Sequence, residues 1–459
     1  MEAIARACNE KSVLKSVRNS VEYDSALNFD ACSKSLLITE TVDKHGGRIL
    51  WRIPMEDILY VNSEADEGFE LAAMSFTNKV RGGCLCYSES SPKDRKLLNF
   101  HIKSKPYGEH ITKFVEAMNQ ELLGENISVK RKTLVVINPR AGKGNACAEW
   151  EERVQPLMRK SRKFEDFQVL FTQHKLHACD FGNELASRII SSESGNYNVV
   201  ILGGDGVVFE LLNGIYRSFP SEYLSVLKRI VWCPLPCGSG NGLCYSSLCL
   251  ANEPFTMNCA LRLLMRQKFN PKDLGIINFE KNGVFQSRLF SLTISWGLVA
   301  EVDINSEFLR TVFGDARFTI YGIIKVLEKK TLKASLAWEN SAQEIKPDYL
   351  TVYATLVPVA ARTVILDPGK GMADGSISVH RLIGSEMNRF ALVSALDELS
   401  RNRDHSKHIS GFAPILSRSF ELVPAESSPA GIVVDGEQLT KGPIKVSVLP
   451  SATNVFSNS

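Results

Sequence analysis

The 459-residue chain lacks a long uninterrupted hydrophobic run. A membrane-spanning helix needs about 20 consecutive apolar residues, whereas the most apolar window, Tyr349 to Leu366, is broken by Pro358 and Arg362. Its richness in Val and Thr predicts a buried pair of strands instead. The segment from Met1 to Glu10 also lacks the apolar stretch of a secretory signal peptide. We therefore expect a cytoplasmic protein without a transmembrane helix.

Paired CxxC motifs, the mark of many zinc sites, are also absent. The 11 cysteines are an odd number and are scattered, as in Cys84/Cys86 and Cys233/Cys237. The eight histidines form no metal-ligand pattern either. We expect no zinc site and the reduced thiols of a cytosolic protein.

A large net charge is missing as well, because 54 Lys and Arg stand against 51 Asp and Glu, which leaves +3. This balance gives no global reason to expect nucleic acid as a partner, so we expect none. The 44% of hydrophobic residues argues against a mainly disordered chain. The length predicts two or three domains.

Residues 1–128 contain short β-rich runs and end in a helical pattern, which together predict a small β-rich domain, by architectural analogy pleckstrin-homology-like. The expected strands and final helix are Ser35–Thr41, Ile49–Ile53, Ile58–Val61, Phe69–Phe76, Leu97–Ile102 and Tyr107–Leu123.

Residues 129–270 alternate strand and helix patterns, which predicts a doubly wound α/β domain with a parallel sheet. The expected strands are Thr133–Asn138, Phe167–Thr172, Asn198–Leu202 and Val231–Leu235, and the expected helices are Trp150–Arg159, Ala178–Ser191 and Val207–Tyr216. Ligands of such sheets bind beyond the carboxyl ends of the strands.

Residues 271–459 are dominated by strand patterns and predict an antiparallel β-sandwich with one helical insert, Ser306–Lys330. The expected strands are Asp273–Phe279, Arg288–Ser295, Ala334–Trp338, Tyr349–Val357, Thr363–Leu366, Ser376–Leu382, Phe420–Val423, Gly431–Val434 and Ile444–Leu449.

Three glycine-containing loops follow three of the expected strands of the α/β region, namely Asn138–Gly144, Gly203–Gly206 and Gly238–Asn241. Glycine leaves backbone N–H groups uncovered, and helix amino ends favour anions, so such loops can wrap phosphate oxygens. One glycine loop is most often only a turn, but three at strand ends of one region indicate a phosphate site.

Asp205 lies between glycines at a strand end. It could accept or orient the proton of a hydroxyl that attacks phosphorus. The structural alternative is a cap for the helix expected from Val207. Both interpretations stay open on the residues alone.

Asn-Pro-x-x-Gly-Lys-Gly at 138–144, Gly-Gly-Asp-Gly at 203–206 and Pro-x-Gly-Ser-Gly-Asn at 236–241 resemble the signatures of the diacylglycerol kinase catalytic superfamily. The segments 295–303 and 306–318 and the motif Val434–Glu437 resemble sphingosine kinases in particular. The resemblance covers residues 130–450. It implies a nucleotide-binding α/β domain followed by a β-rich lipid-binding domain, with ATP and Mg²⁺ between them.

The resemblance also implies residue roles. Asp205 matches the catalytic aspartate that activates the lipid hydroxyl, within the substrate-side motif Gly203, Gly204, Asp205 and Gly206. Positions that match nucleotide contacts are Asn138, Pro139, Arg140, Thr172, Glu210, Gly238, Ser239, Gly240, Arg310, Arg317, Asp435, Gly436 and Glu437. Residues 173–176 depart from the family pattern.

Arg310 and Arg317 match a pair that holds ATP phosphates, as guanidinium groups do. The alternative is a surface ion pair with Glu307 or Asp315. Asp435 and Glu437 match an acidic pair near Mg²⁺. An Asp-Gly hairpin turn is the structural interpretation of Asp435, and the two are compatible.

Asp303 matches the aspartate that recognises the amino-alcohol head of a long-chain base. A buried ammonium needs an acidic partner, whereas diacylglycerol and ceramide carry no amine. The alternative for Asp303 is a helix N-cap before Ser306.

An apolar stripe with a basic rim in residues 313–330 suits a helix that contacts a membrane or gates a lipid pocket, and ordinary packing is the alternative. The resemblance implies an ATP- and Mg²⁺-dependent sphingosine kinase, and with this stripe we expect it at the membrane surface, with a homodimer among the compatible assemblies. A ceramide or diacylglycerol kinase and a non-catalytic lipid- or nucleotide-binding scaffold are the rival hypotheses.

Overall fold

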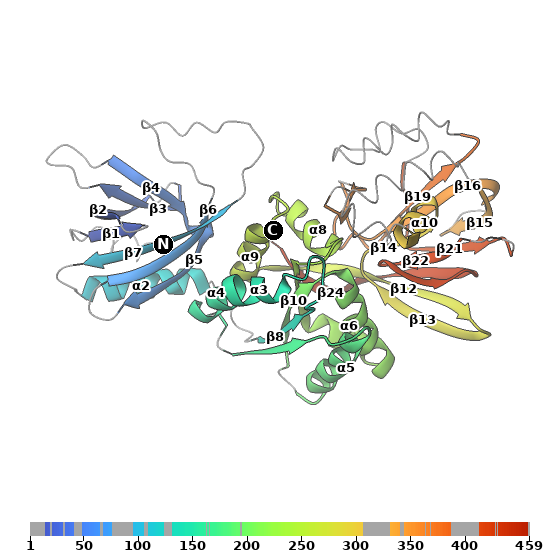
Figure 1. Cartoon of the computed structure of the whole chain (residues 1–459), viewed down its shortest axis with the longest axis horizontal. Helices are drawn as coiled ribbons and strands as arrows, with labels where there is room; N and C mark the ends of the chain where they lie inside the picture. The colour runs from blue at the N-terminus through green and yellow to red at the C-terminus, as the bar shows by residue number, and fades with distance from the viewer. Residues whose placement is uncertain are drawn as a thin grey trace.

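The computed structural model describes residues 14–457 except for 19–20, 31–32, 41–47, 65–67, 76–94, 105–108, 124–130, 162, 165, 193–194, 306–330, 340–343, 363, 368, 387–412, 427 and 429. The described elements form three parts along the chain, which follow one another from left to right in Figure 1 as an antiparallel sheet, an α/β unit and a second β-rich part.

The N-terminal part is a seven-stranded antiparallel sheet in the order β4-β3-β2-β1-β7-β6-β5. One helix, α2 (Glu109–Leu123), follows the last strand, and its Phe114, Val115 and Met118 are buried in the core of this part. The strands are β1 (Leu14–Arg18), β2 (Val21–Asp30), β3 (Ser35–Glu40), β4 (Arg48–Pro54), β5 (Ile58–Glu64), β6 (Gly68–Ser75) and β7 (Lys96–Ser104).

The five strands and the helix expected here from the sequence are confirmed to within three residues at either end, but β1 and β2 were missed. In β2 the alternation of apolar and polar residues is interrupted at Ser25 and Ala26, and Asp24 and Asn28 are weak strand formers. The strand forms because its backbone pairs with β1 and β3, which outweighs its weak local propensity.

The α/β unit has a parallel sheet in the order β9-β8-β10-β11, extended beyond β11 by β24. The expected α/β alternation is confirmed. The strands are β8 (Lys132–Ile137), β9 (Phe167–Phe171), β10 (Tyr197–Gly203) and β11 (Ile230–Pro236). The helices are α3 (Ala146–Glu149), the π-helical turn η2 (Trp150–Val154), α4 (Gln155–Lys160), α5 (His177–Ile190), α6 (Asp205–Ser218), α7 (Tyr223–Lys228), α8 (Gly242–Leu250) and α9 (Met257–Arg266).

Strand β8 lies between β9 and β10, so the chain leaves β8 toward one side and later crosses to the other. This reversal makes a topological switch point between β8 and β10, and a ligand crevice is expected at the carboxyl ends of such strands. The loops after β8 and β10 begin at that edge.

Apolar residues cover both faces of this sheet. Val135 and Ile137 of β8 contribute to one core, with Trp150 and Leu261, whereas Leu134 and Val136 contribute to the other. Because neighbouring strand residues point to opposite faces, continuous hydrophobic strands are what a sheet buried on both sides requires.

The third part consists of antiparallel pairs and is continuous with the α/β sheet. The long strand β24 (Ile444–Phe456) pairs with β12 and, at its end, lies parallel to β11. The other elements are β12 (Phe269–Lys281), β13 (Val284–Phe290), β14 (Thr293–Gly297), α10 (Leu298–Asn305), β15 (Leu332–Trp338), β16 (Glu344–Thr355), β17 (Val359–Ala361), β18 (Val364–Ile365), β19 (Ile377–Ile383), β20 (Ile415–Ser417), β21 (Ser419–Pro424), β22 (Ile432–Val434) and β23 (Glu437–Thr440).

One expected strand, Arg288–Ser295, was wrong, because the chain breaks into β13 and β14 at Ser291 and Leu292. The backbone N–H groups of Ser291, Leu292 and Thr293 donate to the carboxylate of Asp435 rather than to a neighbouring strand. A side chain distant in the sequence therefore ends the ladder. Of the expected insert, residues 306–330 lie outside the described part.

In the part of the chain that the structure describes, no helix has both the length and the apolarity to cross a membrane. The seven cysteines described, at positions 147, 179, 233, 237, 244, 249 and 259, form no disulfide.

Helices α5 and α6 approach closely through two glycines. A Cβ added at Gly214 of α6 would lie 2.1 Å from the carbonyl oxygen of Cys179 in α5. We predict that Gly214→Ala lowers the free energy of unfolding by about 1–3 kcal/mol, because the helices must separate. Gly206, with nothing within 4 Å of an added Cβ, is the matched control, and Gly206→Ala should not destabilise. Urea unfolding of both variants checks this, and equal midpoints would contradict it.

Candidate active site

The three glycine loops expected from the sequence meet at the carboxyl edge of the parallel sheet. A Cβ added at Gly238 would lie 2.3 Å from the Cα of Gly204, and one at Gly142 would lie 2.4 Å from the carbonyl oxygen of Cys237. Backbone therefore packs on backbone at both points, which only glycine allows. Because the loop after β11 touches those after β8 and β10, the three loops form one structural unit.

The loop after β8 is a pair of tight turns that begins at Asn138. The Asn138 backbone N–H donates to Leu202 at 2.9 Å, and its side-chain oxygen accepts the N–H of Arg140 at 3.0 Å. Pro139 follows, and Arg140 is exposed. Asn138 thus organises the turn, while the Arg140 side chain is accessible to a ligand.

The loop after β11 is held by Asn241, which the sequence analysis placed in a motif but not among the site residues. Its side-chain oxygen accepts the N–H of Gly238 at 2.8 Å, and its amide donates to the Gly238 carbonyl at 2.7 Å. Asn241 has φ of 58°, a conformation that Asn tolerates better than most residues. Ser239 at the loop tip is exposed, and Gly240 is partly buried.

Asp205 begins α6 directly after the β10 loop, but its carboxylate binds a different helix. It accepts the N–H groups of Gly242 at 2.9 Å and Leu243 at 3.2 Å, at the amino end of α8. The N-cap of α6 is Gly204. Asp205 therefore does not cap its own helix, as the structural alternative expected. It links the start of α6 to the start of α8.

Burial raises the pKa of Asp205 to about 6, and the charge of Asp435 acts in the same direction. The two backbone hydrogen bonds from α8 oppose this rise because they favour the charged form. A carboxyl group with such a pKa can exchange a proton near neutral pH.

Glu210, one turn further along α6, caps helix α5. Its carboxylate accepts the N–H of Leu176 at 3.0 Å and of Ala178 at 3.2 Å, and Leu176 has φ of 69°. Glu210 therefore shapes the loop that begins at Thr172, whose N–H donates to Ile137 of β8 at 2.9 Å. Its contacts are structural, and a role in nucleotide binding stays a prediction.

Asp435 and Gly436 form the two-residue turn between β22 and β23, with φ values of 47° and 85°. Positive φ at both positions is the geometry for which Asp-Gly is suited, so the hairpin turn is confirmed. The buried carboxylate also accepts the N–H groups of Ser291, Leu292 and Thr293 at 2.7–2.9 Å and the Ser291 hydroxyl at 3.2 Å. Both of its oxygens are thus already engaged by protein donors.

Glu437, at the start of β23, meets the α/β unit. Lys175, in the loop after β9, donates to its carboxylate at 2.8 Å. The Lys175 side chain is largely exposed and that of Glu437 is partly exposed, and this hydrogen bond raises the pKa of Lys175. The contact joins residues 262 positions apart and brings the third part of the chain to the edge that holds the glycine loops.

The donor set for a metal is incomplete within the described residues, where no group of three or more His, Cys, Asp or Glu side chains could hold an ion. Glu437 is accessible, but the Asp435 oxygens are engaged. Arg310 and Arg317 lie outside the described residues. Asp303 is the sixth residue of α10, which is not the position of an N-cap, and its side chain is outside the described part.

Residues 132–277 match the family model described as "Diacylglycerol kinase catalytic domain". The chain is 33% identical over 215 residues to sphingosine kinase 1 of Homo sapiens, which covers 45% of this chain and 51% of that protein. It is 24% identical over 447 residues, 88% of each protein, to sphingoid long chain base kinase 4 of Schizosaccharomyces pombe. The chain spans about half the length of the first relatives it matches.

A crystal structure of a putative diacylglycerol kinase from Bacillus anthracis is similar in fold, with a TM-score of 0.53 at 18% identity over 73% of this chain and 98% of that one. This similarity and the family match confirm the α/β fold expected for the nucleotide-binding unit.

Asp435 is buried and holds its turn, whereas Glu437 is accessible, so the stability effects of replacing these two acids can be compared. We predict that Asp435→Asn lowers the free energy of unfolding by about 2–4 kcal/mol, because an amide NH₂ would face buried N–H groups. Glu437→Gln should change it by less than about 1 kcal/mol, since its ion pair is exposed. Chemical unfolding measures both. Equal stability of the two variants would show that Asp435 is not an anchor.

Proposed function

We propose that the protein is a lipid kinase that transfers the γ-phosphoryl group of ATP to the primary hydroxyl of sphingosine or a related long-chain base, giving sphingosine 1-phosphate. The observation that carries the proposal is the Asp205 carboxylate, with its raised pKa, at the meeting point of three glycine loops. Similarity to sphingosine kinase 1 and to a yeast long chain base kinase supports the substrate class.

The glycine loops provide the phosphate-binding surface. The loops after β8, β10 and β11 precede helices, whose amino ends carry partial positive charge. Arg140 and Ser239 are exposed beside these backbones and would contact the nucleotide. Arg310 and Arg317 are proposed as further phosphate-binding residues on the resemblance alone.

In the proposed reaction, Asp205 accepts the proton of the lipid's primary hydroxyl. That oxygen forms a bond to the γ-phosphorus, and the bond from phosphorus to the ADP oxygen breaks. The two α8 hydrogen bonds fix the carboxylate, so the base is already oriented when the hydroxyl arrives.

Mg²⁺ would neutralise part of the negative charge of the ATP phosphates. Kinases usually hold it with one or two carboxylates plus substrate phosphates rather than a complete protein cage. Glu437 suits this arrangement, because it is accessible and its partner Lys175 is exposed. Asp435 would act by holding the hairpin that carries Glu437.

Asp303 is proposed to recognise the ammonium of the long-chain base, because a cation removed from water needs an acidic partner. Ceramide and diacylglycerol lack this cation. A ceramide or diacylglycerol kinase is therefore the rival enzyme, and a non-catalytic scaffold is the rival of another class. A panel of these lipids with labelled ATP separates the three.

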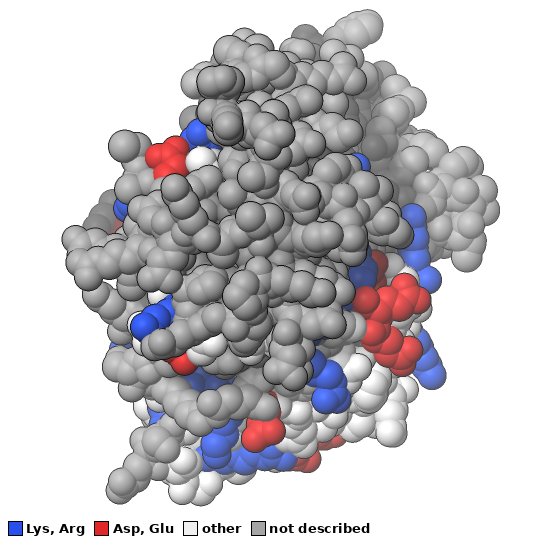
Figure 2. Space-filling model, turned by 90° about the vertical axis from the view of Figure 1, so that its left-hand side faces the viewer, with Lys and Arg blue, Asp and Glu red and all other residues white. Residues whose placement is uncertain are grey.

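The finer architecture and the location are proposed as well. Seven antiparallel strands closed by one helix support a pleckstrin-homology-like N-terminal domain, and the antiparallel pairs of the third part support a lipid-binding sandwich. We propose a cytoplasmic enzyme that contacts membranes peripherally through residues 313–330. On the described part of the face in Figure 2, basic and acidic side chains lie next to one another. A homodimer stays a prediction.

Replacement of the proposed base tests the catalytic assignment. We predict that Asp205→Asn lowers kcat for sphingosine phosphorylation by about 10²–10⁴-fold, the usual contribution of a general base. ATP binding should be little changed, which nucleotide titration would check. Turnover equal to wild type would refute the role of Asp205.

The raised pKa of Asp205 predicts a pH dependence. The carboxyl group must be charged to accept a proton, and with a pKa of about 6 it becomes protonated as pH falls through that value. We therefore expect kcat/KM to fall about tenfold per unit below pH 6. A profile that is flat down to pH 5 would contradict this.

Head-group recognition is tested at Asp303. We predict that Asp303→Ala raises KM for sphingosine about tenfold or more, since the ammonium loses its partner, while KM for ATP stays unchanged. Asp303→Glu is the matched control that keeps the charge. An unchanged KM for sphingosine would favour a purely structural role.

A further inference from the structure

Helix α8 is fixed at its amino end by the proposed catalytic carboxylate. Its first two backbone N–H groups, of Gly242 and Leu243, donate to Asp205. Carboxylates are favoured at a helix amino end because the free N–H groups and the helix dipole point toward them. Any displacement of α8 therefore changes the position of this carboxylate or breaks its hydrogen bonds.

The carboxyl end of α8 is fixed by a second acid, Glu253. The backbone N–H of Glu253 donates to the Leu248 carbonyl of α8 at 2.8 Å. Its side chain is buried, with 4% exposure. Because this connection is short, a displacement of the Glu253 side chain would also displace the last turn of α8.

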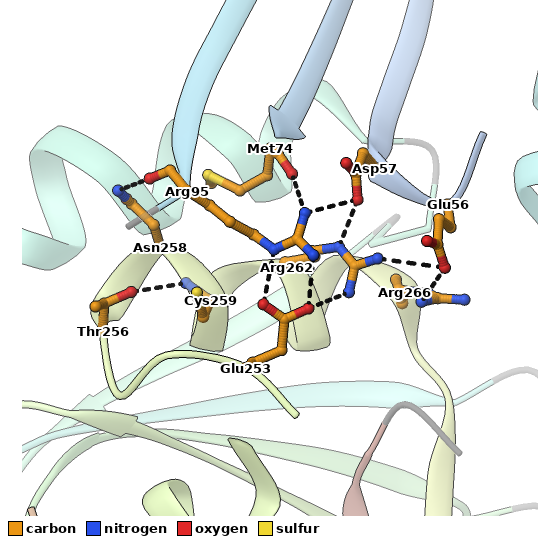
Figure 3. Close-up of polar contacts among 10 residues, drawn as sticks. All are labelled: Glu56, Asp57, Met74, Arg95, Glu253, Thr256, Asn258, Cys259, Arg262 and Arg266. Carbon is orange, nitrogen blue, oxygen red and sulfur yellow. Dashed lines mark hydrogen bonds and ion pairs between the residues drawn. The ribbon is translucent and has the colours of Figure 1, made fainter. Parts of the chain in front are cut away.

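Glu253 belongs to a buried ionic cluster with Asp57, Arg95 and Arg262, drawn in Figure 3. Arg95 binds both Glu253 oxygens, at 2.7 and 2.8 Å, and also binds Asp57 at 2.8 Å. Arg262 of α9 binds Glu253 at 2.9 Å and Asp57 at 3.0 Å. Two cations and two anions thus alternate, so the cluster is neutral as a unit.

The cluster spans two parts of the chain. Asp57, after β4, and Arg95, before β7, belong to the N-terminal part. Glu253 precedes α9, and Arg262 lies within it. Figure 3 shows the side chains converging between the strands of the N-terminal sheet and α9. Tyr60 and Met74 of the N-terminal sheet also share an apolar core with Leu261 and Leu264 of α9. The N-terminal part is therefore packed against the α8–α9 segment.

We propose that the N-terminal part positions the Asp205 carboxylate through α8, with Asp57 and Arg95 as positioning residues. They hold the side chains of Glu253 and Arg262, the Glu253 backbone is bonded to the end of α8, and the start of α8 is bonded to Asp205. The effect on turnover rests on the proposed kinase function, whereas the anchoring of α8 does not.

The physical basis is that a buried charge tolerates few positions. With Arg95 in place, the Glu253 carboxylate has charged partners on two sides and cannot move without leaving a buried ion unpaired. Bidentate contact with a guanidinium also fixes its orientation. Because desolvation offsets much of the attraction, we infer that this cluster acts on the geometry of the contact more than on net stability.

The test is the double variant Asp57→Asn/Arg95→Met, which removes one charge of each sign. The pair of Glu253 and Arg262 then stays neutral within the α/β unit, so we expect the variant to fold, which circular dichroism would check. The matched control is Glu70→Gln/Lys160→Met. It removes another ion pair between the same two parts, with a 2.7 Å separation, but touches neither Glu253 nor α9.

Hydrogen exchange of the α8 amides at 242–246 is the primary measurement. In Asp57→Asn/Arg95→Met we expect exchange to be about tenfold faster than in wild type, the size of a typical coupling between contacting residues. The Glu70→Gln/Lys160→Met control should match wild type. Unchanged exchange in the first variant, or an equal rise in both, would overturn the proposal.

Turnover is the second measurement. With sphingosine as substrate, kcat should fall about tenfold in Asp57→Asn/Arg95→Met, while KM for ATP stays within twofold of wild type. Faster α8 exchange with unchanged kcat would overturn the link to Asp205. If wild-type protein phosphorylates no lipid, the proposed function fails, and the exchange result still decides whether α8 is anchored from the N-terminal part.

Discussion

The contact between the Asp205 carboxylate and the first N–H groups of α8 is the interaction on which the site depends. It joins the loop after β10 to the loop after β11, and the same two loops touch through Gly204 and Gly238. Helix α8 also contacts the third part, where the Ser246 hydroxyl donates to the Val359 carbonyl at 2.9 Å. This short helix thus contacts the third part directly and is linked to the N-terminal part through Glu253.

Asp205 and Asp435 are both buried acids, but their surroundings give them different roles. Burial raises the pKa of both. The Asp435 carboxylate accepts four hydrogen bonds and serves as an anchor of the β22–β23 turn. The Asp205 carboxylate accepts two from α8 and keeps the capacity to take a proton. The difference lies in the number of donors, since each favours the charged form.

The last strand explains why the α/β unit and the third part are continuous. Strand β24 passes from β12 and β21 to β11, and Thr453 accepts the buried indole N–H of Trp232 at 2.8 Å. Residues at the end of the chain thereby complete the sheet whose edge carries the glycine loops. The third part is held beside the site by backbone pairing as well as by side-chain packing.

The sequence by itself determined the α/β alternation, the longer strands of the third part apart from the break at Ser291, and the glycine loops, because these follow from local periodicity and from residues with special backbone freedom. It missed the short strands β17, β20 and β23 and ended the last strand at Leu449, whereas β24 continues to Phe456. It also determined the Asp435–Gly436 turn, whose geometry depends on two adjacent residues. The site residues Arg310, Arg317 and Asp303 rest on the resemblance, since their side chains lie outside the described part.

Only the tertiary structure decided which partners the polar side chains find. Nothing local indicates that Glu210 caps α5, that Asn241 closes its loop, or that Asp205 binds α8 rather than its own helix. The cluster of Asp57, Arg95, Glu253 and Arg262 joins residues up to 205 positions apart. Ion pairs and hydrogen bonds over such separations leave no periodic trace in a sequence, because they form only after the chain has packed.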